Sequence, residues 1–204
     1  NQQTVQLNRY CLEGYNTLCL PFSLTAEQVA VAVKDLKVER LVGIQQEGAT
    51  LNLYFVDCTA DGIQAGVPYL VYSPTSQYMR VKNTEVLGFD AELKAVRMED
   101  GKGNAVTFGS SWESIQKEGR YGIPAKQDVT PLESVLLKTD VEKIFLPTRC
   151  GVNWDKQAAS ASELKIRHIG SMGEATAILG INPDDATEGD YYNLQGQKIS
   201  KDAK

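Results

Sequence analysis

The sequence predicts a mainly β fold, either an antiparallel β-sandwich or a barrel-like sheet, with one short capped helix. Three observations lead to this class. Apolar and polar residues alternate along many short segments, Gly, Asp and Asn residues separate these segments, and only one segment has the clear apolar spacing of an amphipathic helix. Helical segments do not recur between the strands, so the pattern differs from the βαβ units of a parallel sheet.

The helix signal follows the apolar stretch that closes on Pro21. Proline has no N–H to donate to a central ladder, so the strand before it should end there. Thr25 occupies the N-cap position, and Gln28, three residues later, completes a capping box. We therefore predict a helix over about Ala26–Leu36. Its apolar face consists of Val29, Ala32, Val33 and Leu36.

Strands are predicted where the period of two is clear. Thr50–Asp57 places Leu and Phe on one face, and Val67–Tyr72 forms another strand that starts at Pro68 or lies at a sheet edge. Ala95–Glu99 and Ala105–Phe108 flank a glycine-rich turn and predict a hairpin. Further predicted elements are strands at Tyr121–Ile123, Lys143–Leu146 and Leu164–Ile169, and a second short helix at Pro131–Val135.

The chain divides by composition into three parts. Residues 1–179 form a β-rich domain, built as one unit or as two subdomains. Gly180–Asp190 is acidic and contains Gly and Pro, which is typical of a linker. Residues 191–204 then form a C-terminal strand and tail.

Composition excludes several partners. The formal net charge is −5 and no run of Lys or Arg is present, so the chain lacks the clustered cations that bind nucleic acid or an anionic membrane. No segment approaches the roughly 18 apolar residues of a membrane-spanning helix. The first residues are polar, so an exported protein would have lost its signal peptide before Asn1.

The cysteines permit two interpretations. Their spacings contain no C-x-x-C, which excludes zinc-ribbon and thioredoxin motifs. An even number allows two disulfides in any of three pairings, whereas buried thiols would pack as small apolar side chains. The candidate disulfide cysteines are Cys11, Cys19, Cys58 and Cys150.

Candidate catalytic and metal groups are sparse. Cys150 and His168, the only histidine, are one conceivable nucleophile and base, but no nucleophile motif surrounds Cys150 and no G-x-S-x-G turn is present. The acidic stretch Asp184–Asp190 resembles a calcium loop but has Ala186 at a ligand position, so no metal site is predicted. Carboxylates near predicted strand ends or turns, which a glycoside hydrolase would use as a pair, are Asp57, Asp61, Asp90, Glu99 and Asp100.

Aromatic side chains are the best candidates for ligand binding. Trp112 and Trp154 lie in polar segments, and Tyr78 is assigned to the predicted loop Ser73–Gln77 that follows the Val67–Tyr72 strand. Flat rings on the loops of a β-sandwich can stack on sugars. The competing interpretation is that both tryptophans anchor loops on the core, because tryptophan is highly buried on average.

Four segments resemble parts of a module of secreted and surface proteins of Bacteroidetes. In order, "YNTLCLPFSLTAEQ", "LNLYFVD" and "GIQAGVPYLV" resemble its strand, capped helix and following strands. "YYNLQGQKIS" resembles the Tyr-Asn-Leu-x-Gly-Gln-Lys/Arg segment near the C-termini of such proteins. The likeness covers Tyr15–Tyr72 and Tyr191–Ser200, with looser matches at Val106–Gly109 and Lys143–Arg149.

The resemblance implies export to the periplasm, cell surface or medium, where disulfides are chemically permitted. It also implies a non-enzymatic accessory, adhesion or scaffold role. Tails of the family usually continue with a further hairpin, whereas this chain stops at Lys204, as a shortened chain or as a tail that is not a sorting signal.

The leading hypothesis is therefore an exported, non-enzymatic domain without a cofactor, whose partner is a glycan or a cell-surface protein. The first alternative is a carbohydrate-binding module that uses Trp112, Trp154 and Tyr78. The second is a hydrolase that uses a carboxylate pair, or Cys150 with His168.

Overall fold

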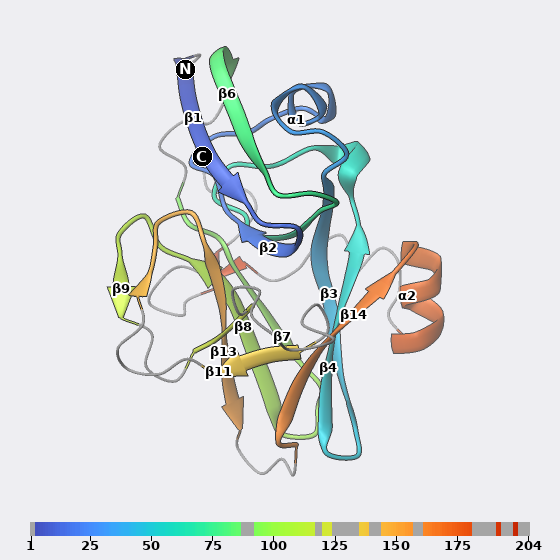
Figure 1. The fold of residues 1–204 in the computed structure, drawn as a ribbon. Coiled ribbons are helices and arrows are strands. Elements are labelled where there is room, and N and C mark those ends of the chain that lie inside the picture. The colour runs from blue at the N-terminus through green and yellow to red at the C-terminus, as the bar shows by residue number, and fades with distance from the viewer. Residues whose placement is uncertain are drawn as a thin grey trace.

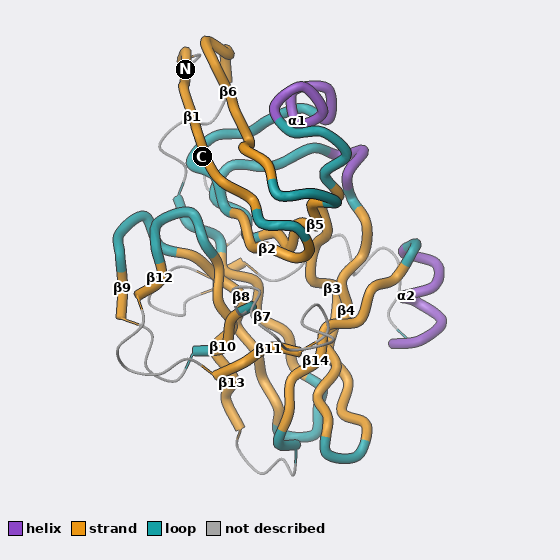
Figure 2. Tube along the Cα trace, in the orientation of Figure 1, coloured by secondary structure: helices purple, strands orange, loops and turns teal. Residues whose placement is uncertain are grey.

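The computed structural model of the protein describes residues 3–86, 92–116, 120–123, 135–138, 144–156, 161–180, 191–192 and 198–199. The predicted class is confirmed, because most of these residues lie in strands (Figures 1 and 2). The first half contains β1 Gln3–Cys11, β2 Gly14–Leu18, α1 Ala26–Ala32, β3 Lys37–Glu47, β4 Thr50–Asp57, the 3₁₀ turn η1 Thr59–Asp61, β5 Tyr69–Ser73, β6 Gln77–Val86 and β7 Ala95–Glu99. The second half contains β8 Asn104–Ser110, β9 Ile115–Gln116, β10 Tyr121–Gly122, β11 Val135–Lys138, β12 Ile144–Phe145, β13 Cys150–Lys156, β14 Glu163–Ile169, α2 Met172–Leu179, β15 Tyr191–Tyr192 and β16 Lys198–Ile199.

Most of the strands form one long sheet, in the order β16-β15-β7-β8-β13-β10-β11-β14-β4-β3-β5-β2. Two small sheets stand beside it, one formed by β1 with β6 and one by β9 with β12. Among the strands that the structure describes, the pairing is antiparallel except between β14 and β4, which run parallel. That pair departs from the predicted antiparallel arrangement, because β14 joins β4 from a distant part of the chain and not through a hairpin.

The long sheet curls until its β2 end contacts β13. The Cys19 N–H donates to the carbonyl of Thr148 at 2.9 Å, and the Cys150 N–H donates to Oγ1 of Thr17 at 2.8 Å. A flat sheet would keep β2 and β13 far apart, since several strands separate them in the sheet order. A curled sheet of this kind is compatible with the predicted architectures.

Three apolar clusters hold this arrangement together. One lies inside the curled sheet and includes Phe55 and Phe108, whose rings meet edge to face at 5.6 Å between centroids. Figure 1 shows β8 and β13 on one side of this core and β3, β4 and β14 on the other. A second cluster joins α1 and the strands β1 and β6 to the sheet. A smaller third cluster packs α2 against β3, β4 and β14.

Helix α1 begins where the sequence predicts but ends at Ala32, earlier than the predicted Leu36. Val33 already has an extended backbone, with φ −154° and ψ 130°. Strand β6 then binds the backbone of Lys34. The side chain of Gln77 accepts a hydrogen bond from the Lys34 N–H and donates one to the Lys34 carbonyl. Val33 and Leu36 are still buried in the core. The apolar pattern therefore identified the buried residues correctly but overestimated the length of the helix.

The predicted β7–β8 hairpin is confirmed, with Val96 opposite Phe108 and Glu99 opposite Ala105. Strand β5 starts at Tyr69, just after Pro68, as expected of a residue without an N–H. Helix α2 was not predicted, although Ser171 caps its start and Gly180 ends it in the left-handed conformation. Of the predicted helix Pro131–Val135, residues 131–134 lie outside the described residues and Val135 begins β11. The linker after Gly180 and most of the tail also lie outside them.

The capping box of α1 gives a direct stability prediction. Oγ1 of Thr25 accepts a hydrogen bond from the Gln28 N–H at 3.2 Å, and Oε1 of Gln28 accepts one from the Thr25 N–H at 2.8 Å. We expect Thr25→Ala to lower the free energy of unfolding by about 1 kcal/mol, measured by urea denaturation. Thr25→Ser keeps the hydroxyl and should change it by only a few tenths of a kcal/mol. Equal losses in the two variants would contradict the role of the hydroxyl.

Candidate binding surface

The structure separates the three aromatic residues that the sequence proposed as one binding set. Trp112 and Trp154 are half-buried against the core inside the curled sheet. Nε1 of Trp154 donates to Oδ1 of Asn104 at 3.1 Å, and the ammonium of Lys156 lies 3.8 Å from the centroid of the indole ring. Tyr121 meets the same indole edge to face at 5.6 Å. The environments of both tryptophans agree with anchoring on the core.

Tyr78 lies in a different part of the molecule. It belongs to strand β6 and not to a loop, which corrects the expectation from sequence, because the turn after β5 is shorter than predicted. Its cross-strand partner on β1 is Tyr10, a residue that sequence reasoning missed because the register of β1 on β6 brings the two together. The ring centroids are 4.9 Å apart, with the planes tilted by 57°.

This tyrosine pair is exposed. Tyr10 keeps 44% of its surface and Tyr78 keeps 47%, both high for aromatic residues in strands. The guanidinium carbon of Arg80 lies 5.2 Å from the centroid of the Tyr78 ring, within the range of a cation–π contact. Alternation explains the exposure, since Cys11 and Met79, the next residues along the two strands, point into the core. We call Tyr10, Tyr78 and Arg80 the tyrosine patch.

A groove runs between β6 and α1, close to the tyrosine patch. Its volume is about 370 Å³. Val31 on its rim is 88% exposed, far more than the other large apolar side chains of the described residues. Figures 1 and 2 show α1 beside β6 at one end of the molecule. The groove is lined by Glu27, Gln28, Val31, Ala32, Arg80, Val81, Lys82 and Thr84.

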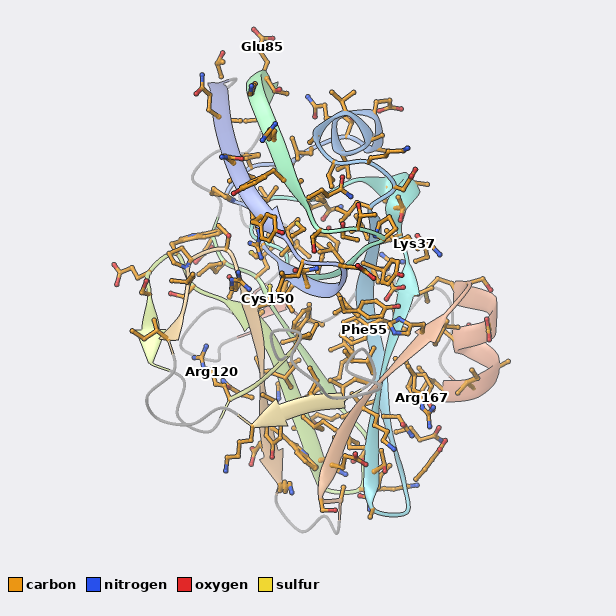
Figure 3. All side chains as sticks on the ribbon, in the orientation of Figure 1. Lys37, Phe55, Glu85, Arg120, Cys150 and Arg167 are labelled. Atoms are coloured by element: carbon orange, nitrogen blue, oxygen red, sulfur yellow. The ribbon has the colours of Figure 1, made fainter. Side chains whose placement is uncertain are left out.

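Hydrogen bonds fasten the two ends of α1 to the two ends of β6. Near the start of the helix, Nε2 of Gln28 donates to the carbonyl of Glu85 at 3.1 Å. After its end, Gln77 holds the backbone of Lys34. A second cavity, of about 580 Å³, adjoins the start of α1 and shares Glu27 and Gln28 with the groove. Figure 3 shows Glu85, which borders this cavity, at the outer end of β6.

All four cysteines are free, buried thiols in this structure. Burial raises the pKa of Cys19 to about 12 and that of Cys58 to about 12 as well. The pKa of Cys150 is also raised well above its ordinary value by burial. Because the thiolate is the reactive form, these cysteines are poor nucleophiles. Disulfide pairing stays a prediction; Cys19 and Cys150 share the core inside the sheet, whereas Cys58 belongs to the core below α1.

His168 pairs with an acid that sequence reasoning did not find. Its Nδ1 lies 2.7 Å from Oε2 of Glu39, a residue of β3 that is only 5% exposed. The imidazole stacks on the ring of Tyr15 at 4.3 Å between centroids and 8° between planes. No hydrogen bond joins His168 to Cys150, although the structure describes both residues. The geometry therefore gives a histidine held by a carboxylate, without the proposed Cys–His pair.

The other candidate carboxylates have local roles. Asp100 accepts hydrogen bonds from the backbone of Lys102 and Asn104, which closes the β7–β8 turn. Burial raises the pKa of the Asp100 carboxyl, but the hydrogen bonds from Asn104 and Lys102 outweigh burial, so the pKa is lowered from its ordinary value. Glu99 pairs with Arg97 at 2.8 Å. Asp57 accepts from the Thr59 N–H, Asp61 borders the second cavity, and Asp90 lies outside the described residues. Within the described ranges, no three His, Cys, Asp or Glu side chains are arranged to hold a metal ion.

Comparison of the chain with protein-family models, with curated proteins and with solved structures finds no match. In the part of the chain that the structure describes, neither helix is long and apolar enough to cross a bilayer.

Proposed function

We propose that this chain is an exported, non-enzymatic adhesion, accessory or scaffold domain that binds a partner protein through the tyrosine patch. The observation that carries the proposal is the exposed Tyr10–Tyr78 pair with Arg80 beside it. Tyrosine and arginine are the residue types that most often dominate binding at protein interfaces. The neighbouring groove extends the same end of the molecule into a larger contact surface.

A carbohydrate-binding module is the second candidate, and the same tyrosine pair favours it. Two tilted, half-exposed rings can stack on successive sugar units. In this arrangement the sugar would contact Tyr10 and Tyr78, while Trp112 and Trp154 would only stabilise the core and would not contact the sugar. A glycan ligand would make little use of the apolar groove beside α1, so a protein partner fits the whole surface better.

The test is binding to an array that carries both glycans and purified extracellular-matrix proteins. We expect the wild-type chain to bind protein spots, and the double variant Tyr10→Ser/Tyr78→Ser to lose binding by about tenfold or more, because it removes both anchors. Surface plasmon resonance on the positive spots would measure the loss.

The matched control is Ile178→Ser, which removes a 41% exposed apolar side chain from α2, an element outside the patch. This variant should bind like the wild type. Binding to glycans alone, lost in the double variant, would favour the carbohydrate-binding alternative. Binding that the tyrosine changes leave intact would refute the patch as the binding surface.

A further inference from the structure

We propose that the groove between α1 and β6 binds an extended segment of a partner protein, in which an apolar side chain is flanked by carboxylates. This inference rests on the proposed function and specifies the chemistry of the ligand. The groove is defined above by its lining residues, and its volume of about 370 Å³ suits a short stretch of chain.

The apolar part of the ligand follows from the groove's interior. Ala32 and Val81 are buried residues that line it, and Val31 stands on its rim almost fully exposed. An exposed valine beside an apolar groove gains free energy when a partner's apolar side chain covers it, because both surfaces leave water. The segment should therefore place an aliphatic or aromatic side chain between Val31 and Val81.

The acidic part follows from the charges on the β6 side. Arg80 and Lys82 are exposed, alternate along the strand and share one face of it. Both line the groove, in a chain whose formal net charge is −5. Carboxylates of the ligand would complement these two cations and increase both the association rate and the specificity. Glu27 also lines the groove and would repel a carboxylate placed beside it.

The extended conformation follows from the edge of β6 that faces away from β1. Among the described residues no other strand pairs with β6, although the carbonyl of Glu85 near the end of the strand already accepts a hydrogen bond from Gln28. A segment that lies along a sheet edge can add hydrogen bonds from its own backbone, which is a common mode of peptide recognition. Because Gln28 and Gln77 already fix α1 relative to β6, the groove is formed before binding and little ordering is required.

The experiment measures fluorescence anisotropy of labelled synthetic peptides with the full chain. One probe alternates leucine with aspartate, a second replaces the aspartates with lysine, and a third replaces the leucines with serine. We expect the leucine–aspartate probe to bind the wild type at least about tenfold more tightly than either of the others. Lys82→Glu should weaken that probe about tenfold and strengthen the lysine probe, and Val31→Asp should weaken it by a similar factor.

Two controls match these variants in charge but lie outside the groove. Ala30→Asp places the same carboxylate on the adjacent, exposed residue of α1, which does not line the groove. Lys102→Glu reverses an exposed charge in the β7–β8 turn. Both should bind the leucine–aspartate probe within about twofold of wild type.

Equal binding of the acidic and basic probes, or equal losses in Val31→Asp and Ala30→Asp, would overturn the inference. Failure here is distinct from failure of the proposed function. If Tyr10→Ser/Tyr78→Ser abolishes binding on the array while the groove variants change no peptide affinity, only the groove inference is wrong. If the groove binds the leucine–aspartate probe but Tyr10→Ser/Tyr78→Ser leaves binding on the array unchanged, only the proposal for the tyrosine patch is wrong.

Discussion

Gly62→Ala is expected to lower the free energy of unfolding by about 4 kcal/mol, which is a large part of the ~5–15 kcal/mol that stabilises a typical domain. Gly62 ends the turn η1 with φ 75° and ψ −152°, a conformation that only glycine adopts readily. A Cβ atom there would lie 2.3 Å from the carbonyl oxygen of Leu24. That oxygen belongs to a fixed bridge, because Leu24 and Ile63 exchange backbone hydrogen bonds at 2.8 Å. Neither chain can yield without breaking this bridge.

Gly48→Ala is the matched control for this prediction. Gly48 also has a positive φ, of 59°, but a Cβ at that position meets nothing within 4 Å. This variant should lose only about 1 kcal/mol, from the left-handed backbone. Urea or thermal denaturation of both variants compares a positive-φ glycine in open space with one held against a fixed backbone. A Gly62→Ala variant as stable as Gly48→Ala would show that the chain at Leu24 moves more easily than its hydrogen bonds indicate.

Arg9→Met should be the second most damaging change, with an expected loss of about 3 kcal/mol. The guanidinium extends inward from β1 and is largely buried, and this burial lowers its pKa. It donates to the carbonyl of Thr148 at 2.6 Å and also to Oγ1 of Thr148 and the carbonyl of Thr17. These bonds join the β1–β6 pair to the point where the long sheet closes. Met keeps part of the apolar stem but leaves the two carbonyls without their charged donor.

Thr148 adds to the loss of stability that is expected when Arg9 is replaced. Its φ of 67° is unusual for a β-branched residue, and two bonds from Arg9 with one from the Cys19 N–H hold it there. The control is Arg97→Met, which removes an arginine from the exposed ion pair with Glu99 and should cost at most about 1 kcal/mol. Hydrogen exchange should also show faster opening of β1 and β6 in Arg9→Met. Equal stabilities of the two variants would refute the role given to Arg9.

The local structure was predictable because its determinants lie within a few residues of each other. The capping box needs only Thr25 and Gln28, and the structure contains both of its hydrogen bonds. The β7–β8 hairpin needs two alternating segments and a turn that fits Asp100 and glycine. The end of α1 was not predictable in this way, because Gln77 of β6 takes over the backbone of Lys34.

The candidate site was only partly predictable. Tyr78 was identified from sequence, but its partner Tyr10 belongs to a strand that pairs with β6 across a long stretch of chain. The tryptophans were proposed as ligand-binding residues for the same reason as Tyr78, and only their packing against the core distinguishes them from Tyr78. Glu39 and His168 likewise meet because β3 and β14 lie on either side of β4 in the sheet, an arrangement that no local pattern records.

The sequence by itself determined the mainly β class, the capped start of α1, the β7–β8 hairpin and the apolar faces of α1 and β4, because alternation and capping act over short distances along the chain. Only the tertiary structure decided which faces remain in contact with water. Exposure of Tyr10, Tyr78 and Val31 depends on which strands pair, in which register, and on where α1 is fastened. Those choices are made by the burial of many distant side chains at once, so the binding surface exists only in the folded molecule.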